Sequence, residues 1–85
     1  MKFKNMKIKI TDEVHLKAVC EVLESVGYEL GVNERNPKAV CTWAFNNSYD
    51  IRVMTVDEMT GHDDEYTLTD LLKMRDEMVK ENAKH

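Results

Sequence analysis

Residues 39–53 restrict the possible folds more than any other part of the sequence. Apolar residues occupy every second position from 39 to 45 and from 49 to 53, and Asn46-Asn47-Ser48 separates the two segments. Such alternation is typical of strands, and asparagine tolerates the positive φ of a tight turn. The segment therefore predicts a β-hairpin. Both faces of its first strand are rather apolar, so we expect that strand to be central and partly covered on both sides.

The hairpin also carries three aromatic residues. By parity, Trp43 and Phe45 share one face of the first strand with Ala39 and Cys41. We expect this face to pack in the core, rather than to stack on a base or fill a partner's pocket. Tyr49 lies on the second strand, where its hydroxyl needs water or a hydrogen-bond partner.

The first half of the chain predicts two strands and a helix. Residues 3–10 and 28–32 alternate between apolar and polar side chains, as strands do. Between them a helix of about four turns is expected, with Thr11 as N-cap and Gly27 as the left-handed C-terminal cap. Its apolar stripe has spacings of three and four and consists of Leu16, Val19, Cys20, Leu23 and Val26.

The second half predicts a loop followed by a last helix. Residues 57–65 show no periodicity and read as a loop. Residues 66–68 either add a short strand or lead directly into a helix capped at Thr67 or Thr69. The apolar stripe of that helix consists of Leu68, Leu71, Leu72, Met78 and Val79, with Met74 at its edge.

This order of elements predicts one α+β domain over residues 1–85. A β-α-β-β-β-α chain buries its apolar stripes best in a small antiparallel or mixed sheet with both helices on one face. The other face is then partly open, and a second copy or a partner is a natural cover for it. The residues expected opposite Trp43 and Ile51 are Val40, Ala44, Met54 and Val56.

Composition excludes several classes of function. The 85 residues include 12 Lys and Arg against 16 Asp and Glu, which gives a net charge of -4. Direct nucleic-acid binding is not expected, because that affinity comes mostly from Lys and Arg at phosphates. No run approaches the ~20 apolar residues of a membrane span, and the start lacks the apolar run of a signal peptide. We therefore expect a cytoplasmic protein with no membrane partner.

The net charge hides an asymmetry along the chain. The first ten residues contain four lysines and no acid, whereas residues 57–65 contain five acids and no base. The two groups either attract each other, within a chain or between chains, or are both solvated surface. The lysines are Lys2, Lys4, Lys7 and Lys9, and the acids are Asp57, Glu58, Asp63, Asp64 and Glu65.

No motif predicts an enzyme, a cofactor or a metal site. Cys20 and Cys41 have no second cysteine at metal-ligand spacing, and both are expected to be buried thiols. His15 precedes Cys20 by five residues, whereas two ligands on one helix face need a spacing of three or four. His62 is followed by three acids, but no zinc helix motif or calcium loop surrounds it. We therefore expect a non-enzymatic protein.

Three segments of the sequence resemble a family of small proteins of tailed bacteriophages. They are the opening Met6-Lys7-Ile8-Lys9-Ile10-Thr11, the helix end Val22-Leu23-Glu24-Ser25-Val26-Gly27-Tyr28, and Glu65-Tyr66-Thr67-Leu68-Thr69-Asp70-Leu71-Leu72-Lys73-Met74. In that family a Gly-Tyr step ends the first helix and a Tyr-Thr-Leu-x-Asp-Leu-Leu segment opens the last one. Here Glu29-Leu30 replaces the aromatic residue that usually follows Gly27-Tyr28. The resemblance carries over no catalytic residue, but it implies a phage context in which short acidic proteins act by stoichiometric binding.

Three hypotheses follow. The first is a binder that inhibits a host or defence protein through the acidic loop of Asp57, Glu58, Asp63, Asp64 and Glu65, by mimicking nucleic-acid charge. The alternative is a homo-oligomeric sponge for a signalling nucleotide, with Lys7, Lys9 and Arg52 at phosphate and Tyr49 stacking on the base. The third is a metal-dependent enzyme that uses His62 and Asp63.

Overall fold

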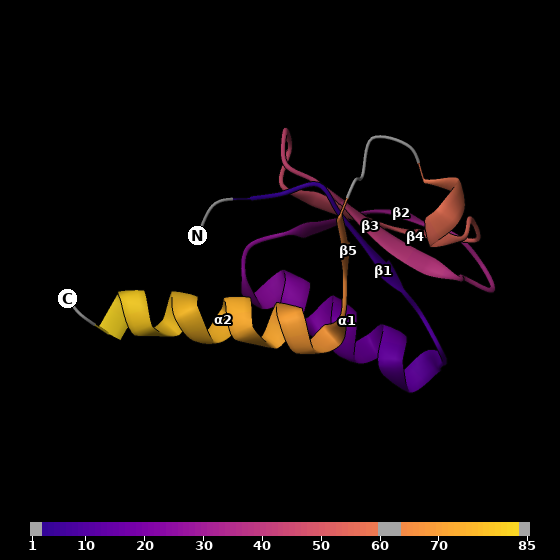
Figure 1. Cartoon of the computed structure of the whole chain (residues 1–85). Coiled ribbons are helices and arrows are strands. Elements are labelled where there is room, and N and C mark those ends of the chain that lie inside the picture. The colour runs from indigo at the N-terminus through magenta and orange to yellow at the C-terminus, as the bar shows by residue number, and fades with distance from the viewer. Residues whose placement is uncertain (1–2, 60–63, 84–85) are drawn as a thin grey trace.

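The computed structural model describes the backbone of residues 3–59 and 64–83, which form a mixed sheet and helices (Figure 1). The sheet has the strand order β2-β4-β3-β1-β5. This α+β architecture confirms the predicted fold class. In chain order the elements are β1 (Met6–Lys9), α1 (Glu13–Ser25), β2 (Glu29–Asn33), β3 (Ala39–Trp43), β4 (Ser48–Arg52), the 3-10 turn η1 (Val56–Glu58), β5 (Asp64–Tyr66) and α2 (Leu68–Ala83).

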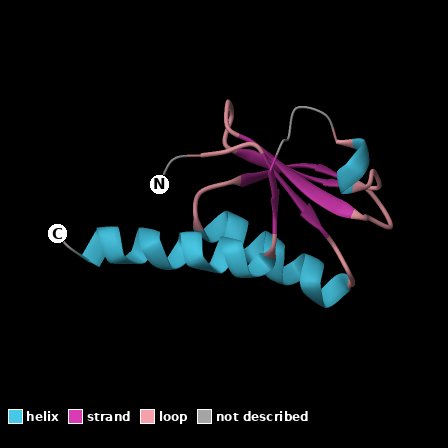
Figure 2. Ribbon diagram, viewed as in Figure 1, coloured by secondary structure: helices cyan, strands magenta, loops and turns pink. Residues whose placement is uncertain are grey.

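The sheet is antiparallel in the middle and parallel at its edges. The central strand β3 pairs antiparallel with β1 and with β4. At the edges, β2 pairs in parallel with β4, and β5 pairs in parallel with β1. Both helices lie on the same face of the sheet, as the sequence predicts (Figure 2).

The predicted hairpin is confirmed as β3 and β4. Its register places Val40 opposite Ile51 and Trp43 opposite Ser48. The turn at residues 44–47 contains Asn47 with φ of 54°, the left-handed conformation that asparagine tolerates. The sequence left open whether a further strand precedes the last helix. The structure forms a strand two residues earlier than residues 66–68: β5 ends directly before Thr67 and lies mostly within the segment 57–65 that was expected to be a loop. It is too short for periodicity to reveal it.

Most of the core lies between the sheet and the helices. Tyr28 is part of it, and its hydroxyl accepts a hydrogen bond from the Lys4 backbone N–H at 3.0 Å. A smaller apolar cluster lies on the opposite face, where η1 covers β3 with Val56 and Met59. The buried residues of the main core are Met6, Ile8, Val19, Val22, Leu23, Val26, Tyr28, Val40, Tyr49, Ile51 and Leu71.

The expected division of the two sheet faces is wrong in part. Val40 and Ile51 pair directly and both belong to the helix-side core, whereas Trp43 packs with Val56 on the other face. The expectation grouped Ile51 with Trp43 because both belong to apolar alternations. Facing strands share a side of the sheet according to pairing register, and the sequence alone does not reveal register.

Phe45 also departs from its expected place in the core. Its side chain is 82% exposed. The strand ends at Trp43, so the turn carries Phe45 out of the alternation that placed it on the strand face. The aromatic residue therefore projects into solvent at the tip of the hairpin.

Two of the three predicted helix caps are confirmed. Gly27 has φ of +109°, as expected of a left-handed cap, and Thr67 exchanges hydrogen bonds with Asp70 in a capping box at the start of α2. The backbone N–H of Thr67 holds the pKa of Asp70 below its usual range. The N-cap of α1 is Asp12 rather than Thr11, because the Asp12 carboxylate accepts the His15 backbone N–H at 2.7 Å.

Candidate functional site

The acidic segment is divided between two elements. Asp57 and Glu58 lie in η1, and Asp64 and Glu65 lie in β5, with all four side chains exposed. Asp63, together with His62, lies outside the described residues. The described acids therefore do not belong to one loop, although each remains accessible to a partner.

The basic first strand lies beside this acidic segment. In the parallel pairing of β1 with β5, Lys7 is opposite Glu65. Side chains at such paired positions point to the same face of a sheet, so the two opposite charges are neighbours. Of the alternatives that the sequence leaves open, attraction within the chain is the one that this register favours for Lys7.

The residues of the nucleotide hypothesis do not form one site. Tyr49 is 1% exposed in the helix-side core, where its hydroxyl donates to Glu24 Oε2 at 2.7 Å. Arg52 forms an ion pair with Glu34, with Nε 3.3 Å from Oε1. Lys7 lies beside Cys41, on the face opposite Tyr49. Stacking of a base on Tyr49 would require the core to open.

An open groove lies on the helix-free side of the sheet. It has a volume of about 470 Å³ and lies where the edge strand β2, β4 and the hairpin turn meet. Trp43 and Phe45 form an edge-to-face pair there, with ring centroids 6.0 Å apart and planes at 69°. The lining residues are Glu29, Leu30, Gly31, Val32, Trp43, Phe45, Asn46, Ser48 and Asp50.

Asp50 holds two of the residues that line this groove in place. Its carboxylate is 9% exposed and accepts two hydrogen bonds, from Trp43 Nε1 and from the Val32 backbone N–H, each 2.8 Å long. The first bond fixes the orientation of the indole. The second ties β2 to β4 at the point where their pairing register shifts between Leu30 and Asn33.

Gly31 makes this arrangement possible. A Cβ at position 31 would lie 2.5 Å from Asp50 Oδ1, which is closer than real Cβ atoms approach an oxygen. The glycine therefore permits close approach of β2 to the carboxylate, and any larger residue would displace one of them.

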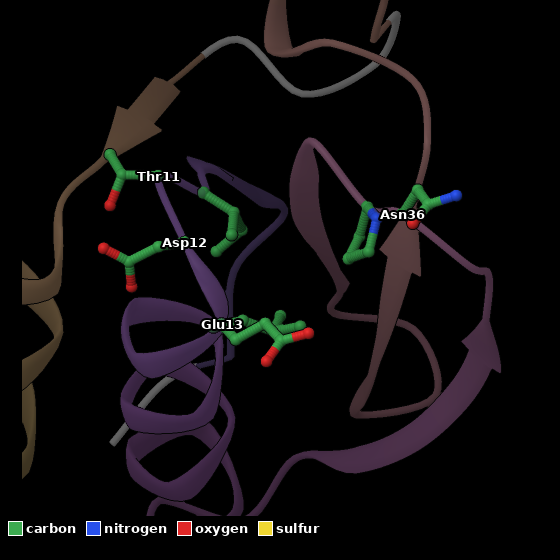
Figure 3. Close-up of a pocket in the computed structure, with 7 residues that line it drawn as sticks. Thr11, Asp12, Glu13 and Asn36 are labelled. Atoms are coloured by element: carbon green, nitrogen blue, oxygen red, sulfur yellow. The ribbon is translucent and has the colours of Figure 1, made fainter.

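A second pocket, of about 240 Å³, lies at the start of α1. Figure 3 shows the N-cap Asp12 and Glu13, the first residue of the helix, with Asn36 across from them on the loop before β3. A helix N-terminus favours anions, but these two carboxylates repel them. Asp12 is moreover engaged in capping the helix, so the pocket offers no site for phosphate.

The cysteines are poor nucleophiles. Burial, followed by the nearby Asp50 carboxylate, raises the pKa of Cys41 from 9.0 to about 11. Burial also raises the pKa of Cys20, which is half-buried near Tyr49. Since the thiolate is the reactive form, both thiols are largely unreactive near neutral pH.

This protonation state predicts slow alkylation of Cys41 in the native protein. In a Cys20→Ser variant at pH 8, we expect the thiolate fraction of Cys41 to be about 100-fold below that of the unfolded chain, from two pKa units. The native state binds the proton more tightly, so stability is expected to fall as pH rises from 9 towards 11. Iodoacetamide labelling followed by mass spectrometry, with and without urea, measures the rates. Equal rates in the two states would contradict the assignment.

Two further properties concern only the described part of the chain. No group of three or more His, Cys, Asp or Glu side chains is arranged to hold a metal ion there. Neither α1 nor α2 has both the length and the apolar character that crossing a bilayer requires.

Sequence reasoning missed the residues that build the groove. The sequence predicts core packing for Trp43 and Phe45; Trp43 packs partly against the smaller apolar cluster as well as lining the groove, and Phe45 is exposed. Asp50 is a solitary acid in an alternating strand and Gly31 a solitary glycine, and neither has a motif around it. An aspartate that faces the covered side of a strand is unusual, but recognising it requires knowing which side is covered.

Comparison with known proteins adds no relative to these observations. No family model, no curated protein and no solved structure matches the chain.

Proposed function

We propose that the chain is a small non-enzymatic protein that binds a partner protein stoichiometrically and thereby inhibits it. The observation that carries this proposal is Phe45, a large apolar side chain that is 82% exposed beside an open groove. Exposed aromatic residues next to a concave surface are common anchors of protein interfaces. The phage resemblance of the sequence suggests a host or defence protein in the cytoplasm as the target.

The construction of the groove supports an interface more than a reaction site. Asp50 uses both carboxylate oxygens to hold Trp43 and β2 in place, which is a positioning task. The hydrogen bond to Asp50 holds the Trp43 indole in position, which reduces the entropy that a partner must remove on binding. Cys41, two residues before Trp43 on β3, is buried with a raised pKa. These features suit a surface that is complementary to another protein.

The exposed acids indicate the charge of that partner. Glu29 lies at the groove, and η1 and β5 contribute the exposed Asp57, Glu58, Asp64 and Glu65. With a net charge of -4, the protein attracts basic surfaces and approaches them faster at low salt. The acidic segment therefore remains part of the proposal as a second, steering contact.

Quantitative capture followed by reconstitution tests this function. The tagged protein is incubated with a bacterial lysate, and the enriched protein is purified for calorimetry with wild type and Phe45→Ala. We expect one-to-one binding that Phe45→Ala weakens by about tenfold or more, in the range of interface anchors. The matched control is Val14→Ala, which removes an apolar side chain that is 80% exposed on α1.

Two further measurements complete the test. A variant with Asp57→Asn, Glu58→Gln, Asp64→Asn and Glu65→Gln is expected to slow association and to reduce its salt dependence. Binding by Phe45→Ala at wild-type affinity, with unchanged circular dichroism, would contradict the groove as the interface. Chemical turnover of the partner would contradict a purely stoichiometric action.

A further inference from the structure

We infer that the β2–β4 groove receives an arginine side chain of the partner protein. This inference deepens the proposed function and rests on it for the source of the arginine. The geometry that carries it is the combination of two aromatic rings with two carboxylates in one groove. Trp43 and Phe45 supply the rings, and Asp50 and Glu29 supply the carboxylates.

The aromatic pair offers faces to a cation. The planes of Trp43 and Phe45 meet at 69°, with centroids 6.0 Å apart, so the two rings form adjoining walls rather than a closed stack. Phe45 is 82% exposed, and Trp43 is half-buried with its indole N–H directed to Asp50. A guanidinium group placed against such ring faces is attracted by their quadrupoles. The hydrogen bond to Asp50 keeps the indole in position before the ligand arrives.

The charges of the groove select the same ligand. Among the described residues that line it, two are acids and none is a lysine or arginine. Asp50 is 9% exposed and accepts a hydrogen bond on each oxygen, from Val32 N–H and Trp43 Nε1–H, so it contributes negative potential from beneath the groove surface. The exposed Glu29 carboxylate is the one that a guanidinium group can reach, and pairing with it displaces neither Trp43 nor Val32. An anion would be repelled, and an apolar side chain would leave the carboxylates desolvated without compensation.

Arginine fits this site better than lysine does. Its guanidinium group is planar, so it stacks on a ring face while its N–H groups reach a carboxylate at the edge of the ring. Lysine presents a compact and strongly hydrated charge that gains less from the ring walls. The groove therefore offers both a ring face for stacking and a carboxylate for hydrogen bonds, and arginine is the cationic side chain that uses the two together.

The inference can be tested without the partner. The probe is N-acetyl-arginine methylamide, titrated into ¹⁵N-labelled protein while the Trp43 indole N–H is followed by NMR. Trp43 is the only tryptophan of the chain, so this signal is unambiguous. The matched ligand is the citrulline analogue, which has nearly the same shape without the charge. We expect saturable shifts with arginine, weaker binding of the lysine analogue, and citrulline binding that is weaker by about tenfold.

Variants locate the site. Phe45→Ala is expected to weaken arginine binding by about fivefold, and Glu29→Gln by about twofold. Val14→Ala and Glu21→Gln, which change exposed residues of α1, are the matched controls and are expected to leave binding unchanged. Equal binding of citrulline, wild-type affinity of Phe45→Ala, or shifts confined to other elements would each overturn the inference.

The two proposals fail in different ways. If Phe45→Ala loses the partner but the arginine probe does not bind wild type, the interface stands and the arginine assignment is wrong. If the probe binds at Trp43 but partner binding is indifferent to Phe45→Ala, the arginine site stands and the proposed interface is wrong.

Discussion

Replacing Leu71 by alanine is expected to lower the free energy of unfolding by about 2–5 kcal/mol, the range for large-to-small changes in a packed core. Leu71 is 1% exposed and belongs to the core between the sheet and the helices. Of the α2 side chains that the structure describes, Leu71 is the buried one, and Leu68, Leu72, Met74 and Met78 pack against the same core partly buried. A domain of this size has a total stability of roughly 4–13 kcal/mol, so the variant loses a large share of it. Urea denaturation followed by circular dichroism measures the change.

The same helix offers a matched control for this prediction. Val79→Ala also shortens an apolar side chain of α2, but Val79 is 57% exposed. Its expected cost is less than about 0.5 kcal/mol, because surface changes leave no cavity and alanine favours the helix. Equal losses in the two variants would contradict the burial of Leu71 in the helix-side core, to which α2 belongs as the neighbour of α1 (Figure 1).

Replacing Thr42 by valine is expected to cost about 1–3 kcal/mol, because it leaves a buried N–H group without its acceptor. Thr42 is fully buried at the centre of the sheet. Its hydroxyl oxygen accepts the Met6 backbone N–H at 2.8 Å, and the hydroxyl donates to the Lys4 carbonyl at 2.6 Å. The side chain thereby ties the chain just before β1 to β3. Valine keeps the shape of threonine and removes both bonds.

A serine variant separates hydrogen bonding from packing at this position. Thr42→Ser keeps the hydroxyl and loses one methyl group, so its expected cost is about 1 kcal/mol. Denaturant midpoints of both variants at equal m-values give the comparison. A valine variant more stable than the serine variant would show that packing, rather than the two hydrogen bonds, matters at position 42.

Several elements of the fold were predictable because their causes are local. The hairpin follows from alternation around Asn47, and the end of α1 follows from Gly27, whose left-handed backbone few other residues adopt. The cap of α2 follows from Thr67 and Asp70, which are three residues apart. In contrast, β5 depends on the free edge of β1, more than fifty residues earlier in the chain. No local pattern in three polar or half-polar residues could predict it.

The candidate site was less predictable than the fold. The sequence favoured the core for Trp43 and Phe45. Trp43 does pack against the cluster that contains Ala39 and Cys41, whereas Phe45 lies one step of alternation beyond the end of β3 and is exposed. The sequence drew attention to the acids and the lysines, yet pairing of β1 with β5 places Lys7 opposite Glu65. Asp50 can accept the Val32 backbone N–H only because β2 pairs with β4, and the sequence does not reveal that pairing.

Apart from η1 and β5, the sequence by itself determined which segments become strands and helices, and that the fold is α+β. Periodicity, caps and turn residues act over a few positions, so they are readable from the chain alone. Only the tertiary structure decided which face each strand presents, because that depends on register between distant segments. The tertiary structure also placed Lys7 of the basic first strand opposite Glu65 of the acidic segment, so these two opposite charges are neighbours within the chain. It also brought Gly31, Trp43 and Asp50 together from three strands to form a groove that no single segment encodes.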